Sequence, residues 1–256
     1  MSLAVLATNR IIKILGNIAK ILSYPFHWLF PNKRFTIPAF SPAKINVENK
    51  HKIPKKFWQT NYTNKVTLPV YLNYLFNRLM SLDYEYHYVG DDDVLEYLEK
   101  NSSTEVFEAY KKLTNGAAKA DLWRVVVLYN EGGVYLDMDA HFVWPLSKII
   151  KPEDEELYVS TKLHISNYFL AVQKGDKIFK DAIDVIVKNI QTQNIEAGVY
   201  GLTGPGALND AIGDREVNFK LYREICVQGD FTNEHFQYMD KKMGKWIHAK
   251  KDELIK

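Results

Sequence analysis

From residue 53 to about 145 the sequence alternates between short strand-like segments and longer helix-like segments. Alternating apolar and polar residues predict strands at 84–90 (YEYHYVG) and 134–143 (VYLDMDAHFV), whereas 67–83 has the apolar spacing of a helix. A second helix is expected to end at Asn130, before Gly132 and Gly133. Strands joined by helices need crossover connections, which produce a sheet covered by helices. The sequence therefore predicts an α/β fold.

Charge and proline content divide the chain into three parts. Residues 1–56 contain ten Lys or Arg and a single acid, Glu48, whereas the remainder contains 23 basic and 30 acidic residues. We expect a basic amphipathic arm at 1–35, a linker at 36–50 and a compact domain at 51–256. Because the expected domain is net acidic, a nucleic-acid partner is not expected.

The arm has the pattern of a helix with two different faces. Polar and basic residues share one face of 10–22, and aliphatic residues fill the other. Pro25 is expected to end this helix before the aromatic cluster of Phe26, Trp28 and Phe30, and no apolar run approaches the ~20 residues of a membrane span. Such a helix either lies on an anionic membrane surface or packs on its own domain or a second subunit. With a single cysteine, Cys226, the chain fits a reducing compartment, so we expect a cytoplasmic protein at the inner face of the membrane.

Two acidic residues lie directly behind an apolar strand-like segment. If 134–143 is one continuous strand, Asp137 and Asp139 point to the same face, together with Tyr135 and His141, at a spacing of about 7 Å. Unpaired carboxylates are costly to bury, so a pair in this position calls for a cation. Oxygen-only ligation favours Mn²⁺ or Mg²⁺, whose open positions suit diphosphate oxygens. Asp121 and Arg124 are three residues apart and therefore adjacent on the preceding helix.

Three stretches resemble a known family of sugar transferases. They are IPKKFWQTN (53–61), AKADLWRVVVLYNEGGVYLDMDAHFVWPL (118–146) and TGPGALNDAI (203–212), and they resemble glycosyltransferase family 32, with a core similar to that of the clostridial glucosylating toxins. The resemblance implies a GT-A fold, a Rossmann-like nucleotide-sugar domain, here preceded by the amphipathic helix. It also implies a retaining enzyme that uses Mn²⁺ (or Mg²⁺) to move a hexose from a nucleotide-sugar donor to a glycan or lipid-linked acceptor, in cell-surface polysaccharide synthesis.

The resemblance also implies roles for individual residues. Asp121 and Arg124 would contact the donor's hydroxyls and diphosphate, and Asp137 and Asp139 would form the D-x-D pair; these four are the expected catalytic residues. The metal would be held by Asp137, Asp139 and a late histidine, His248. In the opening motif Trp58 and Asn61 stand where the family has His and Trp. The full expected donor site comprises Trp58, Gln59, Thr60, Ala120, Asp121, Arg124, Tyr135, Asp137, Met138 and Gly204.

Other interpretations of these residues remain open. The acidic pair could cap a turn, Asp121–Arg124 could be a surface ion pair, and His248 could be an ordinary surface histidine. Asp91–Asp93 are expected to cap the helix that follows them. Other functions would be transfer to a protein acceptor, phosphoester hydrolysis of the haloacid dehalogenase type, or non-catalytic binding of a sugar nucleotide.

Overall fold

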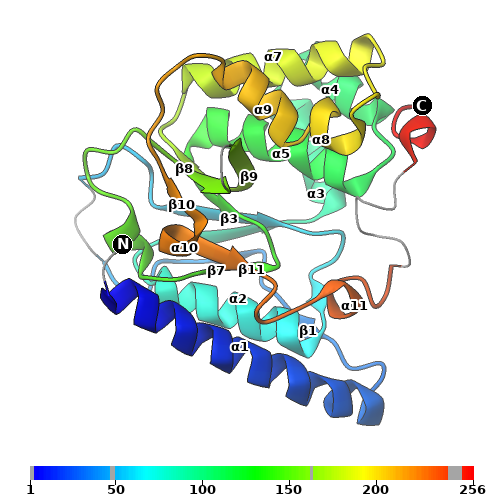
Figure 1. Ribbon diagram of the computed structural model, residues 1–256. Coiled ribbons are helices and arrows are strands. Elements are labelled where there is room, and N and C mark those ends of the chain that lie inside the picture. Colours follow the sequence, from blue (N-terminus) through cyan, green and yellow to red (C-terminus); the bar gives the residue numbers. More distant parts are fainter. Residues whose placement is uncertain (1–2, 47–49, 162–163, 242–249) are drawn as a thin grey trace.

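The computed structural model describes residues 3–46, 50–161, 164–241 and 250–256, and its centre is a mixed seven-stranded sheet (Figure 1). The strand order is β10-β8-β9-β6-β3-β5-β2; the β10–β8, β6–β3 and β3–β5 pairs are parallel, and the others antiparallel. Its strands are β2 (Phe40–Ser41), β3 (Lys56–Thr60), β5 (Glu85–Val89), β6 (Gly133–Leu136), β8 (Glu156–Thr161), β9 (His164–Val172) and β10 (Phe219–Leu221). The predicted α/β class is confirmed.

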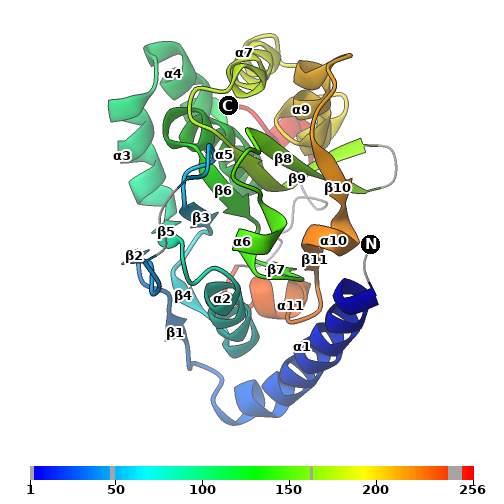
Figure 2. The same ribbon diagram turned by 90° about the vertical axis from the view of Figure 1, so that its left-hand side faces the viewer.

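Helices cover both faces of this sheet (Figures 1 and 2). One layer contains α3 (Asp91–Asn101), α4 (Thr104–Lys112), α5 (Gly116–Glu131), α7 (Lys177–Gln191), α8 (Gly198–Leu202) and α9 (Pro205–Ile212). The other face is covered by α2 (Leu68–Met80) and α6 (Leu146–Ile149), with α1 (Leu3–Leu29) outside α2. The remaining elements are α10 (Tyr222–Ile225), α11 (Glu234–Gln237), a 3₁₀ helix η2 (Lys251–Glu253), and two antiparallel pairs, β1 (Phe35–Thr36) with β4 (Lys65–Val66) and β7 (Ala140–Phe142) with β11 (Cys226–Gln228).

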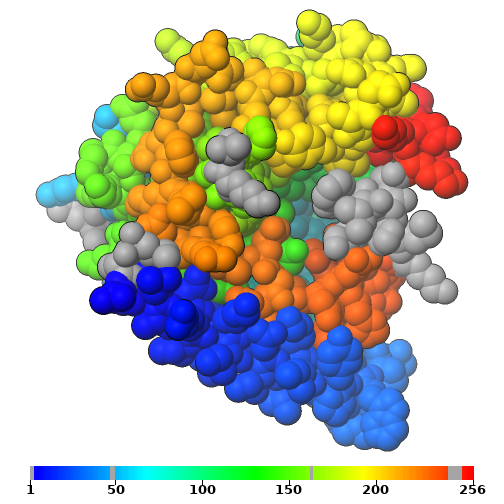
Figure 3. Space-filling view, in the orientation of Figure 1, coloured from blue at the N-terminus to red at the C-terminus, as the bar shows by residue number. Residues whose placement is uncertain are grey.

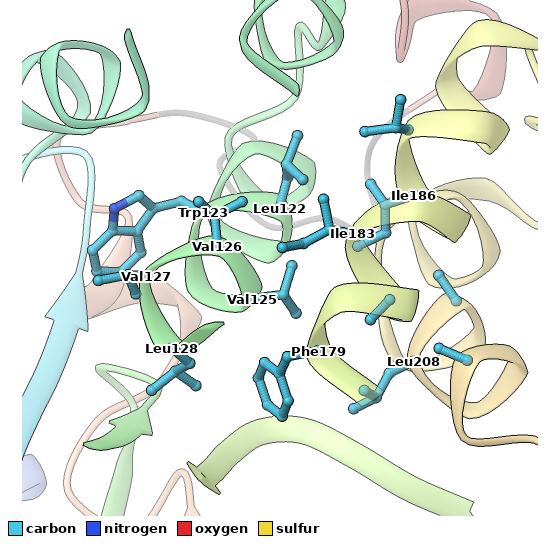
Figure 4. Close-up of a cluster of buried hydrophobic side chains, with 14 of the residues drawn as sticks. Leu122, Trp123, Val125, Val126, Val127, Leu128, Phe179, Ile183, Ile186 and Leu208 are labelled. Atoms are coloured by element: carbon cyan, nitrogen blue, oxygen red, sulfur yellow. The ribbon is translucent and has the colours of Figure 1, made fainter. Parts of the chain in front are cut away.

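The two layers have separate apolar cores, and successive strand residues alternate between them. Trp58 and Tyr135 belong to the core under α5 and α7, whereas their neighbours Phe57 and Val134 belong to the core under α2. Figure 4 shows the first core, where α5 side chains such as Val125 lie against Phe179 and Ile183 of α7. α5 ends where glycine was expected to end it, because Gly132 at φ 65° takes a backbone conformation that favours glycine.

The arm differs from its expected form in two respects. The helix does not stop at Pro25 but continues to Leu29. Aromatic contacts hold its last turn, where the Phe26 ring lies 6.0 Å from that of Phe35. Part of the expected linker is also ordered as sheet, since β2 pairs with β5. Within the described residues, no helix combines the length and apolarity needed to cross a membrane.

The acidic pair does not lie in a continuous strand, so the prediction for 134–143 is wrong in this respect. β6 ends at Leu136, and the Ala140 N–H donates to the Asp137 carbonyl at 3.1 Å, which closes a turn over Asp137–Asp139. The chain then leaves the main sheet, and β7 pairs with β11 instead. A turn at the end of a strand removes the carboxylates from the apolar sheet interior, which is the physical reason for the break.

Candidate active site

The predicted site residues gather around a cavity at the carboxyl ends of the parallel strands β3 and β5. Its volume is about 300 Å³. The start of α5, the Asp137–Asp139 turn, the middle of β9 and the segment 228–241 complete its wall. Ligands of open α/β sheets characteristically bind at the carboxyl ends of the strands. Of the expected donor site, the lining includes Thr60, Ala120, Asp121, Arg124, Tyr135, Asp137 and Met138, and it also includes Asp139.

Two buried asparagines of α2 hold the backbone of the acidic turn. Asn73 Nδ2 donates to the carbonyls of Met138 and Ala140 at 2.8 and 2.9 Å. One helical turn further on, Asn77 Nδ2 donates to the Ala140 carbonyl at 2.9 Å, and its Oδ1 accepts from the Phe142 N–H at 3.0 Å. From the opposite side Gln59 Nε2 donates to the Leu136 carbonyl at 3.1 Å. The turn carrying the acidic pair is therefore fixed by its main chain, which leaves both carboxylates to face the cavity.

Arg124 is the centre of a buried charge network. Its guanidinium contacts Asp121 Oδ1 at 3.1 Å and Asp137 Oδ1 at 3.2 Å, and donates to the Asn167 carbonyl at 2.7 Å. It also lies 4.4 Å from the centre of the Tyr135 ring. Only 5% of Arg124 and 6% of Asp121 is exposed, so these residues do not form a surface ion pair. One cation thus links α5 to the acidic turn and to β9.

Asp121 is held in place by three side chains. Its Oδ1 accepts from Asn167 Nδ2 at 2.9 Å as well as from Arg124, and its Oδ2 accepts from the Thr203 hydroxyl at 3.1 Å. Burial raises the pKa of Asp121 to about 6, although the Arg124 charge acts in the opposite direction. For Arg124, burial acts to lower the pKa, but the carboxylates around it, Asp137 first, more than compensate and raise the pKa. Arg124 is therefore a permanent charge, while Asp121 titrates in mildly acidic solution.

The two carboxylates of the acidic turn have different neighbours. Asp137 Oδ1 accepts from the Tyr135 hydroxyl at 2.8 Å and contacts Arg124, and about a quarter (27%) of the Asp137 side chain is exposed. Asp139 Oδ1 accepts from Gln228 Nε2 at 3.1 Å, and the Asp139 carbonyl accepts from the Gly229 N–H at 3.0 Å. Asp137 is thus tied to the buried network, and Asp139 to the segment after β11.

The expected metal site has two ligands in the described structure rather than three. His248 lies outside the described residues, and within those residues no three His, Cys, Asp or Glu side chains are grouped so as to hold a metal ion. Asp137 and Asp139 offer only carboxylate oxygens to the cavity, which is the chemistry that Mn²⁺ and Mg²⁺ prefer. They suit an ion that takes its remaining ligands from water or a bound diphosphate.

Four residues singled out in the sequence lie elsewhere. Trp58 is buried, donates to the Gly132 carbonyl at 3.0 Å and stacks on His87 at 4.3 Å, so it does not line the cavity. Gln59 supports the acidic turn instead of lining the cavity. Gly204 allows a close approach to α8, because an added Cβ would lie 3.0 Å from the Val199 carbonyl oxygen. His141 is fully buried beside Asp230 at 3.1 Å, because the chain turns before reaching it.

Several lining residues were not predicted from the sequence. Tyr62 follows β3 and stacks on Tyr238 with ring centres 6.4 Å apart, and Lys241 lies 5.0 Å above the Tyr62 ring. Asn167 and Gln228 contact the acidic residues directly. The only signal for any of them was an aromatic residue just after the IPKKFWQTN motif. The capping role expected for the acidic run is supported, since Asp93 accepts from the Gly90 N–H at 3.3 Å, but Asp91 also lines the cavity.

Comparison with known proteins agrees with this site. Residues 69–156 match the glycosyltransferase sugar-binding region containing the DXD motif. The initiation-specific alpha-1,6-mannosyltransferase of Saccharomyces cerevisiae is 30% identical over 101 residues, which are 37% of this chain and 21% of the yeast protein. Its Candida albicans namesake is 28% identical over 133 residues, or 47% and 34% of the two chains. The chain thus covers between a fifth and about a third of the length of these relatives.

A solved structure shares the fold. The PaToxG glycosyltransferase superposes with a TM-score of 0.53 at 20% identity, covering 62% of this chain and 69% of that chain. The fold and the site together define the class: the protein is a D-x-D glycosyltransferase with a GT-A fold, as the sequence predicted. Within that class its sequence relatives are mannosyltransferases and its structural relative is a glycosyltransferase called PaToxG.

Proposed function

We propose that the protein is a metal-dependent, retaining enzyme that moves a hexose from a nucleotide-sugar to a glycan or lipid-linked acceptor in cell-surface polysaccharide synthesis. The observation that carries this proposal is the buried Asp121–Arg124–Asp137 network beside Asp139 in one cavity. A fixed cation next to two partly exposed carboxylates suits a ligand with both phosphate and hydroxyl groups.

The chain's own residues would divide the work of binding the donor. Asp121 is oriented by Asn167 and Thr203 to accept hydrogen bonds from donor hydroxyls. Tyr62 and Asp91, at the ends of β3 and β5, line the part of the cavity proposed for the base and ribose. This assignment replaces Trp58, whose ring is occupied by His87. Mannose is the first sugar to test, because the sequence relatives are named mannosyltransferases.

Asp137 and Asp139 are the residues that would hold the divalent cation. Arg124 and Tyr135 both contact Oδ1 of Asp137, so Oδ2 has no partner among the described residues and could face the ion. When bound, Mn²⁺ or Mg²⁺ would neutralise charge on the departing diphosphate.

Electrostatics and positioning would carry the reaction. The bond from the sugar C1 to the diphosphate oxygen breaks, an acceptor hydroxyl forms the new C1–O bond on the same face, and its proton passes to the departing diphosphate. Arg124 stabilises the negative charge that develops on that leaving group, and because it is already held in place it needs no reorganisation. Retention of configuration is taken from the sugar-transferase resemblance.

The location and the alternatives belong to the same proposal. We place the protein in the cytoplasm at the inner face of the membrane, where lipid-linked acceptors would be accessible. A protein acceptor is the other option for the same chemistry. Phosphoester hydrolysis and non-catalytic binding are less favoured, because the matched region is that of sugar transferases and the charged network is intact.

A donor screen tests this function. The protein is incubated with Mn²⁺ and each common nucleotide-sugar, and released nucleoside diphosphate is measured. We expect one donor to be hydrolysed slowly, EDTA to abolish the release, and added Mn²⁺ to restore it. Asp139→Asn should remove the metal dependence together with the activity, whereas Asp181→Asn, which alters a surface ion pair with Arg215, should leave both unchanged. Undiminished release in EDTA would overturn the metal assignment.

A further inference from the structure

The helix α1 has two faces that contact different surroundings. Its buried residues, Ile12, Gly16, Ser23 and His27, form a narrow stripe against the domain. Most of its large apolar residues point away from the domain and are about half exposed or more. They are Leu3, Ile11, Ile14, Leu15, Ile18, Ile21, Leu22, Trp28 and Leu29, with exposed fractions from 48% to 85%. Sequence analysis left open whether the helix packs on its domain or meets a membrane; its geometry allows both at once.

The outer face is an apolar surface bordered by positive charge. Arg10 and Lys13 line a shallow groove together with Ile14, Ile18 and Ile21. The printed sequence contains no Asp or Glu before Glu48, so no acidic side chain of α1 offsets these cations. Two copies packed through this face would bring like charges together, whereas an anionic lipid surface complements both the cations and the apolar residues. Figure 3 shows the helix along one edge of the molecule, open to such a surface.

The inner face contacts the wall of the cavity. Lys20 Nζ donates to the Gly229 carbonyl at 2.7 Å, and Asn233 Nδ2 donates to the Tyr24 hydroxyl at 2.9 Å. The Tyr24 ring also lies 4.6 Å from that of Phe236. A Cβ placed on Gly16 would come within 3.0 Å of the Asp230 carbonyl carbon, so this contact needs glycine. In Figures 1 and 3 the segment that contains β11 and α11 lies directly against α1.

The same wall segment reaches the acidic turn on its other side. Gln228 contacts the Asp139 carboxylate and Gly229 contacts the Asp139 carbonyl, while Gln237 and Tyr238 line the cavity. The chain of contacts therefore runs from α1 through residues 228–238, here called the wall segment, to Asp139. No other part of the chain is needed to connect them.

We propose that α1 docks through its outer face on an anionic lipid surface and that this docking fixes the wall segment beside Asp139. The two faces are on opposite sides of the helix, so lipid binding and packing do not compete. A helix with its apolar face in water is an element of low local stability. A surface that binds only the packed helix stabilises that state, and with it the wall segment.

Vesicle binding and hydrogen exchange test the two parts without relying on enzymatic activity. Co-sedimentation uses vesicles of phosphatidylcholine with 30% phosphatidylglycerol, and vesicles of phosphatidylcholine alone as the neutral arm. We expect the anionic vesicles to bind the protein, and 1 M NaCl to weaken binding because it shortens the Debye length to about 3 Å. With lipid at ten times Kd, amide exchange in the wall segment should slow by about tenfold.

Two variants separate the faces of the helix. Arg10→Glu/Lys13→Glu should weaken vesicle binding by about 30-fold or more, since each basic residue near such a surface contributes about 1 kcal/mol. The matched control, Lys177→Glu/Lys188→Glu, makes the same charge change on α7, in the opposite layer of the fold, and should bind like the wild type. Gly16→Leu should still bind vesicles, but its wall segment should exchange faster and gain no protection from lipid. Gly16→Ala should give a smaller effect in the same direction, and Ala7→Leu on the outer face should give none.

Several results would overturn the proposal. Absence of binding to anionic vesicles, or equal binding by the two charge variants, would exclude the lipid dock. A dimer in light scattering that Ile14→Asn/Ile18→Asn dissociates would assign the outer face to a second copy of the chain. Vesicle binding without added protection of the wall segment would refute the link to Asp139. A protein that fails the donor screen can still pass these tests, so the two proposals fail separately.

Discussion

Replacing Asn77 with leucine should destabilise the protein more than the same replacement one helical turn away, at Asn73. Both side chains are fully buried and both donate to the turn that carries the acidic pair. They differ at their oxygens. Asn77 Oδ1 accepts from the Phe142 N–H, whereas Asn73 Oδ1 has no hydrogen-bond partner among the described residues.

The hydrogen bonds give the magnitude. Asn77→Leu leaves the buried Phe142 N–H without an acceptor, at about 1–3 kcal/mol, and removes one donated hydrogen bond of about 1 kcal/mol. We expect a loss of about 2–3 kcal/mol in the free energy of unfolding. Asn73→Leu removes two donated bonds but also removes a buried acceptor that had no partner, and these effects nearly offset each other. We therefore expect a loss of about 1 kcal/mol or less at Asn73.

Urea unfolding measures both variants against the wild type, followed by circular dichroism. In a chain of this size, the Asn77 change corresponds to a fall of roughly 5–10 °C in Tm. Equal losses for the two variants, or a larger loss at Asn73, would refute the reasoning, because Asn73 Oδ1 would then have a partner such as an ordered water. An unchanged m-value is needed for the comparison, since a change would indicate an altered unfolded state.

Two further predictions concern the charged network. Arg124→Lys keeps the charge but loses the planar fork that meets Asp121, Asp137 and the Asn167 carbonyl together, so kcat/KM on the identified donor should fall about 10²-fold or more, while Arg215→Lys at a surface ion pair should have no effect. Because burial raises the pKa of Asp121 to about 6, its carboxylate form is lost as pH falls through that value. Donor hydrolysis should therefore decline below about pH 6 with a single-proton limb, and Asp121→Asn should lower the rate and remove that limb.

The fold was predictable where one residue pattern had one physical solution. Alternation in β5 and the glycine-terminated helix α5 depend on neighbours in the sequence, and both formed within a few residues of the expected limits. Asp121 and Arg124 were paired correctly because a spacing of three fixes adjacency on a helix. Their burial, and the contact of Arg124 with Asp137, depend on how α5 packs beside β6 and β9. Local spacing carries no information about that packing.

Where the prediction failed, the deciding contacts were distant in the sequence. Alternation alone extended one strand through 134–143, but Asn73 and Asn77, more than sixty residues earlier, accommodate a turn there by binding its carbonyls. Two asparagines four apart in an otherwise apolar helix were the available signal. On a buried helix face, polar residues at that spacing indicate that the helix must satisfy main-chain groups of another segment.

The arm shows how an amphipathic pattern can identify two faces and still misplace them. The periodicity of 10–22 separates apolar from polar residues, and burial would ordinarily be assigned to the apolar side. Here the domain instead contacts Gly16, Ser23 and His27, where small or hydrogen-bonding side chains let the helix approach the wall segment closely. A helix that served only to complete the core would bury its leucines and isoleucines. One that exposes them while holding a cavity wall through a glycine has a second surface to satisfy, and its position against the wall segment gives that surface a direct structural connection to Asp139.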